Sequence, residues 1–197
     1  MPIGYEYDIF LSYSRCRIIK EWVENHLYPM LHGCLEIHLL TKPKIFIDWN
    51  IEEGEHWKEK LAQTLLKSRS LVTIWSPPYF NSKWCLAELY SFIERQTVLK
   101  NENPEEEYNL LFPIIFNDGD KFPQIAKDIQ AKYDLTEYTI PFPQFKESHD
   151  YIPFYKKIRE MAEKLANRIE NVPEWNPDWP IVMPDPEKNL NKELELF

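Results

Sequence analysis

The sequence predicts an α/β fold built on a parallel sheet, because short apolar strands alternate with amphipathic helices along its first 130 residues. The expected strands are near-continuous apolar runs, which is typical of strands buried on both faces. The segments between them carry apolar residues at helical spacing, and such helices cover the two faces of a parallel sheet. With 197 residues, of which 44% are hydrophobic and 15% aromatic, the chain can build one full core.

The individual elements follow from this alternation. Four strands are expected over Tyr7–Tyr13, Lys44–Asp48, Leu71–Trp75 and Asn109–Phe116. Three helices are expected between and after them, over Ile18–Leu31, Trp57–Leu66 and Trp84–Leu99. Further along we predict a short helix over Phe122–Tyr133, a fifth strand over Leu135–Thr139 and an amphipathic helix over Tyr151–Ile169. The sequence therefore predicts five strands, all parallel, between two layers of helices.

The composition changes after residue 170, so we divide the chain into a domain over 1–170 and an arm over 171–197. Residues 172–186 contain five prolines together with Trp175 and Trp179. Prolines at this density prevent a continuous helix and favour an extended, PPII-like arm. Because two large indole rings need cover, we expect the arm to dock on a partner chain, with packing onto its own domain as the alternative.

Composition also limits the function. A net charge of −9 and a pI near 5.1 argue against a nucleic-acid-binding surface, which needs a basic face. No apolar run is long enough to span a membrane, the N-terminus does not look like a secretion signal, and three scattered cysteines suit a reducing compartment. We therefore expect a cytoplasmic protein. The four glycines and the His and Cys spacings form no phosphate loop or metal motif, so no cofactor and no metal are expected.

The segment from Ser82 to Leu89 is the most informative part of the chain. It reads as the start of a helix with Asn81 or Ser82 as the N-cap. Trp84 and Glu88 are four residues apart and share one helix face. A flat ring beside a carboxylate suits a ribosylated base, since the ring stacks on the base and the carboxylate holds ribose hydroxyls or stabilises a cation at C1′. A core tryptophan and a solvated glutamate are the ordinary alternative.

The expected topology places this pair near a cleft. Open parallel sheets bind ligands at the carboxyl ends of their strands, where the strand order reverses. For five strands in the flavodoxin-like order 2-1-3-4-5, that point lies between the first and third strands. The loops there begin at Tyr13-Ser14-Arg15 and at Ser76, and the second loop leads into the helix that carries Trp84 and Glu88.

Three stretches together resemble a TIR domain, particularly the bacterial and plant-like kind that cleaves NAD⁺. The first is Tyr7 to Ser14, and the second is Phe46-Ile47-Asp48 with Gly54 and Trp57. The third resembles the pattern S-x-x-Y-x-x-S-x-W-C-x-x-E-L, which runs here from Ser76 to Leu89. The resemblance covers roughly residues 5–169. It implies a flavodoxin-like three-layer fold and, where the glutamate is present, cleavage of the nicotinamide–ribose bond of NAD⁺.

The resemblance also implies roles for individual residues. Glu88 matches the catalytic glutamate, and Tyr13, Ser14 and Arg15 match the loop after the first strand. With Trp49, Ser76 and Trp84 they form our set of expected substrate-binding residues, in which Arg15 is a candidate partner for phosphate. Since TIR assembly often completes the active site, we expect other TIR protomers as partners, and the acidic segment 52–55 is a candidate docking surface.

Three function classes stay open at this stage. The first is an NAD⁺ glycohydrolase in antiphage or cell-death immunity, releasing nicotinamide and ADP-ribose or a cyclic ADP-ribose isomer. The second is a non-catalytic TIR scaffold that recruits other TIR proteins and a second immune protein. The third is a deoxyribosyltransferase-like enzyme, which acts on the same type of bond but finds no support in the W-C-x-x-E-L context. The position of Trp84 and Glu88 beside the cleft favours the first.

Overall fold

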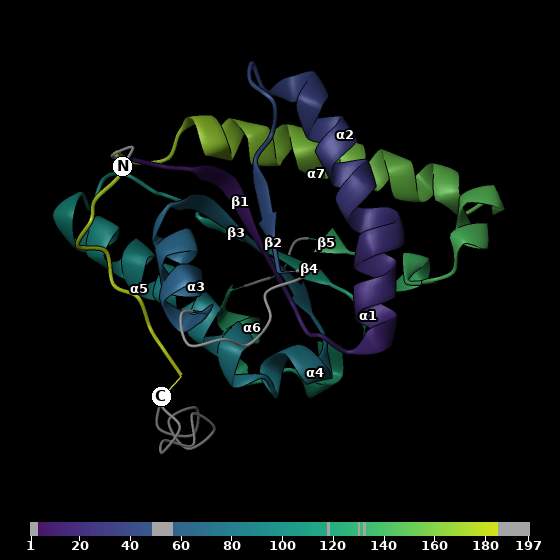
Figure 1. Cartoon of the computed structure of the whole chain (residues 1–197), viewed down its shortest axis with the longest axis horizontal. Helices are drawn as coiled ribbons and strands as arrows, with labels where there is room; N and C mark the ends of the chain where they lie inside the picture. Colours follow the sequence, from purple (N-terminus) through teal and green to yellow (C-terminus); the bar gives the residue numbers. More distant parts are fainter. Residues whose placement is uncertain (1–3, 49–56, 118, 130, 132, 185–197) are drawn as a thin grey trace.

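The fold is a parallel five-stranded sheet covered by helices on both faces, as a computed structural model of residues 4–48, 57–117, 119–129, 131 and 133–184 shows (Figure 1). The strands are β1 (Tyr7–Tyr13), β2 (Ile45–Ile47), β3 (Ser68–Trp75), β4 (Leu111–Ile115) and β5 (Tyr133–Asp134). They are hydrogen-bonded in the order β2-β1-β3-β4-β5, and every neighbouring pair is parallel. The predicted fold class and strand order are therefore confirmed.

The helices form two layers around this sheet (Figure 1). One layer contains α1 (Arg17–Trp22), α2 (Tyr28–His38) and α7 (Tyr151–Glu170), and the other contains α3 (Trp57–Leu66), α5 (Lys83–Glu102) and α6 (Gln124–Ile129). A one-turn helix, α4 (Pro77–Phe80), links β3 to α5, and three short 3₁₀ turns cover Gly119–Lys121, Thr136–Tyr138 and Pro143–Glu147. In the described ranges no helix combines the length and apolar composition needed to cross a bilayer.

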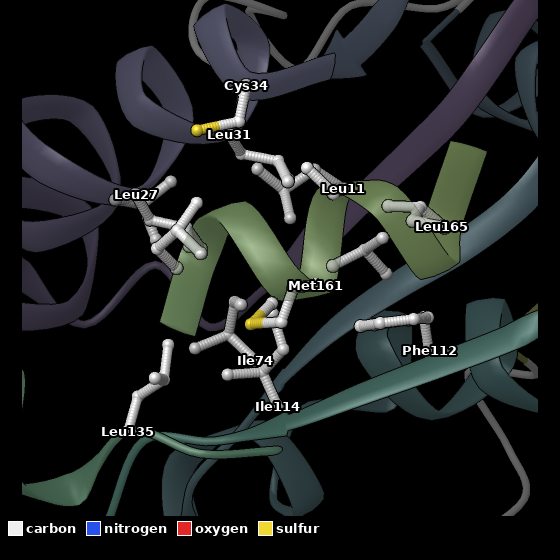
Figure 2. Packing of buried hydrophobic residues seen from close by; sticks show 14 of the residues in the cluster. Leu11, Leu27, Leu31, Cys34, Ile74, Phe112, Ile114, Leu135, Met161 and Leu165 are labelled. Atoms are coloured by element: carbon white, nitrogen blue, oxygen red, sulfur yellow. The ribbon is translucent and has the colours of Figure 1, made fainter. Parts of the chain in front are cut away.

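Alternate residues of the strands supply two separate cores, because successive side chains of a strand point to opposite faces. Ile9 and Leu11 of β1 pack towards α2 and α7, whereas Phe10 between them packs towards α3 and α5. Figure 2 shows the first core, in which Met161 of α7 lies beside Ile74 of β3, and Leu31 of α2 lies near Leu11 of β1. Both faces of the sheet are therefore buried. A ligand-binding site is expected instead at the edge where the strands end.

The first helix of the fold departs from its prediction. We expected one helix over Ile18–Leu31, but the structure continues to His38 and contains a π-helical turn over Val23–Leu27. Pro29 lies two residues after the end of this turn. A proline inside an α-helix lacks the N–H for the regular bond and crowds the carbonyl four residues back. The wider π turn accommodates the proline, so the helix continues instead of ending there.

The fifth strand was predicted in the wrong place. It occupies Tyr133–Asp134, whereas residues 135–139 contain a 3₁₀ turn. The Asp134 carboxylate accepts hydrogen bonds from both the backbone N–H and the hydroxyl of Thr136, at 2.9 and 2.7 Å. This local turn competes with strand pairing and ends β5 after two residues. The helix expected over Phe122–Tyr133 is also shorter, since α6 covers only Gln124–Ile129.

The C-terminal arm packs along its own domain over residues 172–184, so our expectation that it docks on a partner is wrong for that part. The Trp179 ring is only 4% exposed, and the Trp175 indole N–H donates to the Leu66 carbonyl at 3.2 Å. At the end of the described arm, the Val182 N–H donates to the Ser91 hydroxyl of α5 at 2.8 Å. The arm therefore runs beside α5 towards the carboxyl edge of the sheet (Figure 1). The domain division at residue 170 stays a prediction.

Candidate functional site

A cavity of about 180 Å³ lies at the carboxyl ends of the strands, where the strand order reverses between β1 and β3. Its walls come from the end of β1, the residue after β2 and the beginnings of α3 and α5. The lining residues are Phe10, Leu11, Ser12, Tyr13, Arg15, Asp48, Trp57, Ser82, Trp84, Cys85 and Glu88. The topology therefore brings together residues that are up to 78 positions apart in sequence.

The start of α5 fixes the position of Trp84 and Glu88. Ser82 is the N-cap, since its hydroxyl accepts a hydrogen bond from the Cys85 N–H at 3.3 Å. This bond satisfies one of the free N–H groups of the first helical turn. Both Trp84 and Glu88 line the cavity and are half-buried. The expected N-cap and the expected partial exposure of Trp84 are confirmed, and its contact with substrate stays a prediction.

The Glu88 carboxylate is held by the Ser12 hydroxyl, which belongs to a buried hydroxyl network. The Ser12 hydroxyl of β1 donates to the carboxylate at 2.5 Å and lies 3.2 Å from the Tyr79 hydroxyl. Tyr79 in turn donates to the Cys85 carbonyl at 3.1 Å. Ser12 and Tyr79 are both buried, so no solvent competes for these groups. The network ties the end of β1, the one-turn helix α4 and the first turn of α5 to one carboxylate.

Burial dominates the electrostatics of Glu88. The pKa of the carboxyl group is raised to about 8, mainly by burial and in smaller part by the negative charge of Asp48. The Ser12 hydrogen bond and the Arg15 cation lower the pKa and so oppose this shift. A carboxyl group with a pKa this close to neutrality, at the wall of a cleft, is typical of a functional site.

Two tryptophans form the aromatic wall of the cavity. The rings of Trp57 and Trp84 meet edge to face, with their centroids 4.2 Å apart. The Arg15 guanidinium lies 5.9 Å from the Trp57 ring and forms an ion pair with Asp48. Its side chain is 51% exposed, so it borders the opening and leaves the interior of the cavity to the rings and carboxylates.

Of the other residues that we expected to bind substrate, some line the cavity and others do not. Tyr13 lines the cavity with Arg15, whereas neither Ser14 nor Ser76 does. The Ser14 hydroxyl accepts a hydrogen bond from the Cys16 N–H at 3.3 Å, and the Ser76 hydroxyl caps α4 by accepting from the Tyr79 N–H at 3.3 Å. Trp49 and the acidic segment 52–55 lie outside the described residues.

Among the residues that sequence reasoning did not assign to this site are Ser12, Asp48, Trp57 and Tyr79. Asp48 and Trp57 were visible as parts of a family motif, but their place at the cavity depends on the pairing of β2 with β1. Ser12 carried a signal of its own, because it is a polar residue inside an apolar strand. Such a residue usually has a hydrogen-bond partner when it is buried, and here that partner is Glu88.

A second and larger cavity, of about 620 Å³, lies near the amino end of β4. Glu105, Glu106 and Glu107 form part of its rim, and Lys100 and Arg168 also line it. We place the functional site in the smaller cavity. It lies at the carboxyl ends of the strands, where such sheets bind ligands, and it contains the buried carboxyl group.

Comparison with known proteins identifies the family. A family model described as the TIR domain matches residues 9–146. The chain belongs to the TIR domain family. A TIR domain-containing protein of Arabidopsis thaliana is 30% identical over 195 residues, which is 96% of this chain and 69% of that protein.

Two further matches come from plant immunity proteins. The disease resistance protein RUN1 of Vitis rotundifolia is 29% identical over 117 residues, which is 59% of this TIR domain but only 8% of the resistance protein. A solved structure of the activated Roq1 resistosome, which recognises the pathogen effector XopQ, contains TIR domains that are 22% identical. That match has a TM-score of 0.38 and covers 82% of this chain and 84% of the other. In that structure the TIR domains lie within an assembled resistosome.

Proposed function

We propose that this TIR domain hydrolyses the bond between nicotinamide and ribose in NAD⁺ and releases nicotinamide and ADP-ribose. The observation that carries the proposal is the Glu88 carboxyl group, which is fixed by Ser12 at 2.5 Å in a cavity with an aromatic wall. The motif resemblance and the membership of a family with NAD-cleaving members support the same reaction.

A single carboxylate is enough for this chemistry. Ordinary glycosidases need a second carboxyl group, because their leaving oxygen must be protonated. Nicotinamide leaves NAD⁺ as a neutral molecule when the C1′–N bond breaks, so no general acid is needed. Positive charge develops at C1′ of the ribose, and ionised Glu88 stabilises it electrostatically. Water then adds its oxygen to C1′ and loses one proton, which gives ADP-ribose.

The raised pKa of Glu88 fits a cationic substrate. Without ligand the carboxyl group holds its proton up to about pH 8, because burial disfavours the charge. A pyridinium ring placed beside Trp84 brings a positive charge into the cavity and favours the ionised form of Glu88. Binding and ionisation are then coupled, so the carboxylate acquires its charge when the substrate is present to use it.

The decisive experiment compares Glu88→Gln with the wild-type protein. We expect nicotinamide release from NAD⁺ to fall by about 100- to 1,000-fold or more, since one well-placed electrostatic stabiliser is lost. Glu94→Gln is the matched control, because Glu94 is an exposed carboxylate on the same helix. A thermal melt of each variant establishes folding. If folded Glu88→Gln protein cleaves NAD⁺ at the wild-type rate, Glu88 takes no part in the reaction.

The biological role that we propose is an immune or cell-death response in which TIR protomers assemble and consume NAD⁺. The family and its resistance-protein members support this setting. Attack on C1′ by a second part of the substrate, in place of water, would give a cyclic ADP-ribose isomer. Product analysis by chromatography separates these two outcomes. Wild-type protein that forms assemblies but leaves NAD⁺ intact would instead establish the scaffold function.

A further inference from the structure

The face of α5 that carries Glu88 also holds the C-terminal arm. Glu88, Ser91 and Arg95 lie at helical positions i, i+3 and i+7, so they share one face of α5. The Val182 N–H of the arm donates to the Ser91 hydroxyl at 2.8 Å, and the Trp179 ring lies 4.4 Å from the Arg95 guanidinium. The arm therefore contacts α5 within one helical turn of the Glu88 carboxyl group.

The arm is also bonded to α3. The Trp175 indole N–H donates to the carbonyl of Leu66, the last residue of α3, at 3.2 Å. The Arg95 guanidinium, which the arm covers, donates to the neighbouring Leu65 carbonyl at 3.1 Å. Ile181 of the arm packs against the core to which both α3 and α5 contribute. The arm thus links these two helices.

The same two helices form the aromatic wall of the candidate site. Trp57 is the first residue of α3, and Trp84 is the second residue of α5. The centroids of their rings lie 4.2 Å apart at the cavity. Helices in a packed interior behave as rigid elements, so a change in the spacing of α3 and α5 further along is transmitted to this ring contact and to Glu88.

Ser91 has the hydrogen-bonding capacity to link the arm to α5. Its side chain is fully buried, and its single proton is donated to the Ala87 carbonyl at 2.8 Å. A lone pair of the hydroxyl is left to accept from the Val182 N–H of the arm. Since the serine end of this bond is closed to water, breaking it leaves a buried acceptor without its donor.

We propose that the arm positions Glu88 and Trp84 by holding α5 against α3, and that Ser91 is the positioning residue through which it acts. None of the described arm residues lines the cavity, so the effect of the arm on the site passes through α5. The inference rests on the proposed function for its consequence in catalysis, because it concerns the same carboxyl group.

The test removes the bond between the arm and α5 in the full chain. Ser91→Ala deletes the hydroxyl group. Thr97→Ala is the matched control, because the Thr97 hydroxyl also donates to a carbonyl four residues back, that of Ile93 at 2.9 Å, but lies on the exposed side of α5. The carboxyl resonance of Glu88 is followed by NMR across a pH series without NAD⁺, and its absence from Glu88→Gln identifies it. Nicotinamide release is measured separately.

We expect Ser91→Ala to lower the pKa of Glu88 by about one unit or more, because a loosened α5 admits water to a carboxyl group whose pKa is raised mainly by burial. The other groups that act on this pKa are Ser12, Asp48 and Arg15, which lie outside α5 and the arm. The substitution leaves these three groups in place.

The kinetic effect should fall mainly on kcat. Nicotinamide release by Ser91→Ala should lose about tenfold or more in kcat with a smaller change in KM, since a misplaced carboxylate no longer stabilises the transition state. Thr97→Ala should match wild type both in the pKa of Glu88 and in kcat.

Two results would overturn the proposal. One is an unchanged pKa of Glu88 in folded Ser91→Ala with only a lower melting temperature, because the arm would then stabilise the fold and nothing more. The other is an equal shift in Ser91→Ala and Thr97→Ala, since the loss of any hydroxyl from α5 would then suffice.

The pKa measurement separates this proposal from the proposed reaction. A pKa of Glu88 that responds to Ser91→Ala, in a protein whose wild-type form leaves NAD⁺ intact, supports the positioning role and excludes the reaction. If Ser91→Ala does not fold, Val182→Pro decides by the same criteria. It removes the N–H donor from the extended arm and leaves the sequence of α5 unchanged.

Discussion

At the scale of single residues, the hydroxyl network around Glu88 can accommodate both of its protonation states. Tyr79 has one proton and donates it to the Cys85 carbonyl, so Ser12 is free to donate in either direction. When Glu88 is ionised, Ser12 donates to the carboxylate. When Glu88 is protonated, it can donate to Ser12, and Ser12 then donates to Tyr79. Neither state leaves a buried group unpaired, which suits a carboxyl group that changes its charge on binding substrate.

The raised pKa of Glu88 makes the stability of the protein depend on pH. Between about pH 4.5 and pH 8 the unfolded chain releases this proton and the folded chain retains it. The folded state binds more protons in this range, so Glu88 contributes less stability as the pH rises and its contribution levels off above about pH 8. A glutamine side chain at this position cannot ionise, so Glu88→Gln should melt about 2 °C or more above wild type at about pH 8.5.

The gap between the two melting temperatures should close towards about pH 4.5, where Glu88 is protonated in both states. Thermal melts followed by circular dichroism across this range measure it. Glu94→Gln should follow the wild-type curve, because its side chain is exposed. A gap that stays constant from low to high pH would mean that packing, and not ionisation, separates the two proteins.

At the scale of elements, the C-terminal arm stabilises α5 by covering a buried cation. The Arg95 guanidinium donates to the carbonyls of Ser68 and Leu65 at 2.9 and 3.1 Å. It also lies close to two rings, 4.2 Å from the centroid of Phe92 and 4.4 Å from that of Trp179. Burial lowers its pKa to about 10, yet it remains charged at neutral pH. The arm therefore provides one of the two aromatic rings that contact this cation.

We expect Trp179→Ala to destabilise the protein. Truncating a buried tryptophan usually costs about 3–5 kcal/mol, and hydration of the uncovered Arg95 offsets part of this. The melting temperature should fall by about 5 °C or more. Trp175→Ala is the control, because Trp175 is half-buried and its loss should cost less. A Trp179→Ala variant that melts like wild type would show that the arm does not hold this position in solution.

The helices and strands show how far the sequence predicts the structure. Periodicity was enough for α3, whose observed bounds of Trp57 and Leu66 equal the predicted ones. The sheet order was expected from the flavodoxin-like fold and is confirmed. Periodicity failed at β5, where one Asp134 side chain redirects the backbone, and at Pro29, where the helix widens. The prediction for the arm failed for another reason. Trp179 of the arm packs on Arg95, a charged residue on a helix, and such residues are normally expected in solvent.

The residues of the candidate site also divide into those that periodicity predicts and those that it does not. Glu88 and Trp84 were predictable, because a spacing of four places both on one face of a helix whose start is marked by a cap. Asp48 and Trp57 come from different elements and meet Glu88 only through the strand order. Ser12 and Tyr79 are buried hydroxyl groups whose role depends on a contact across 67 to 76 residues. Periodicity describes neighbours along one element and carries no information on such contacts.

At the scale of the whole molecule, net charge opposes the assembly that we propose. Each chain carries a formal charge of −9, so protomers repel one another at low ionic strength. Salt shortens the range of this repulsion, since the Debye length falls from about 30 Å at 0.01 M to about 10 Å at 0.1 M. Contacts between protomers that depend on apolar surface are affected less. Moderate salt should therefore favour association of this protein.

Assembly-dependent activity gives the last prediction. Nicotinamide release per protomer should rise with protein concentration, and the rise should begin at lower concentration in about 0.15 M salt than in about 0.01 M salt. The cavity of about 180 Å³ supplies only part of the surface that a dinucleotide needs, so contacts from a second chain would complete it. Sedimentation velocity at each concentration relates the rate to the oligomer present.

The control is Glu88→Gln, which should associate like wild type and remain inactive, because the carboxylate that it lacks acts on the substrate and not on the neighbouring protomer. A rate per protomer that stays constant while sedimentation shows growing oligomers would separate catalysis from assembly, and each chain would then act alone.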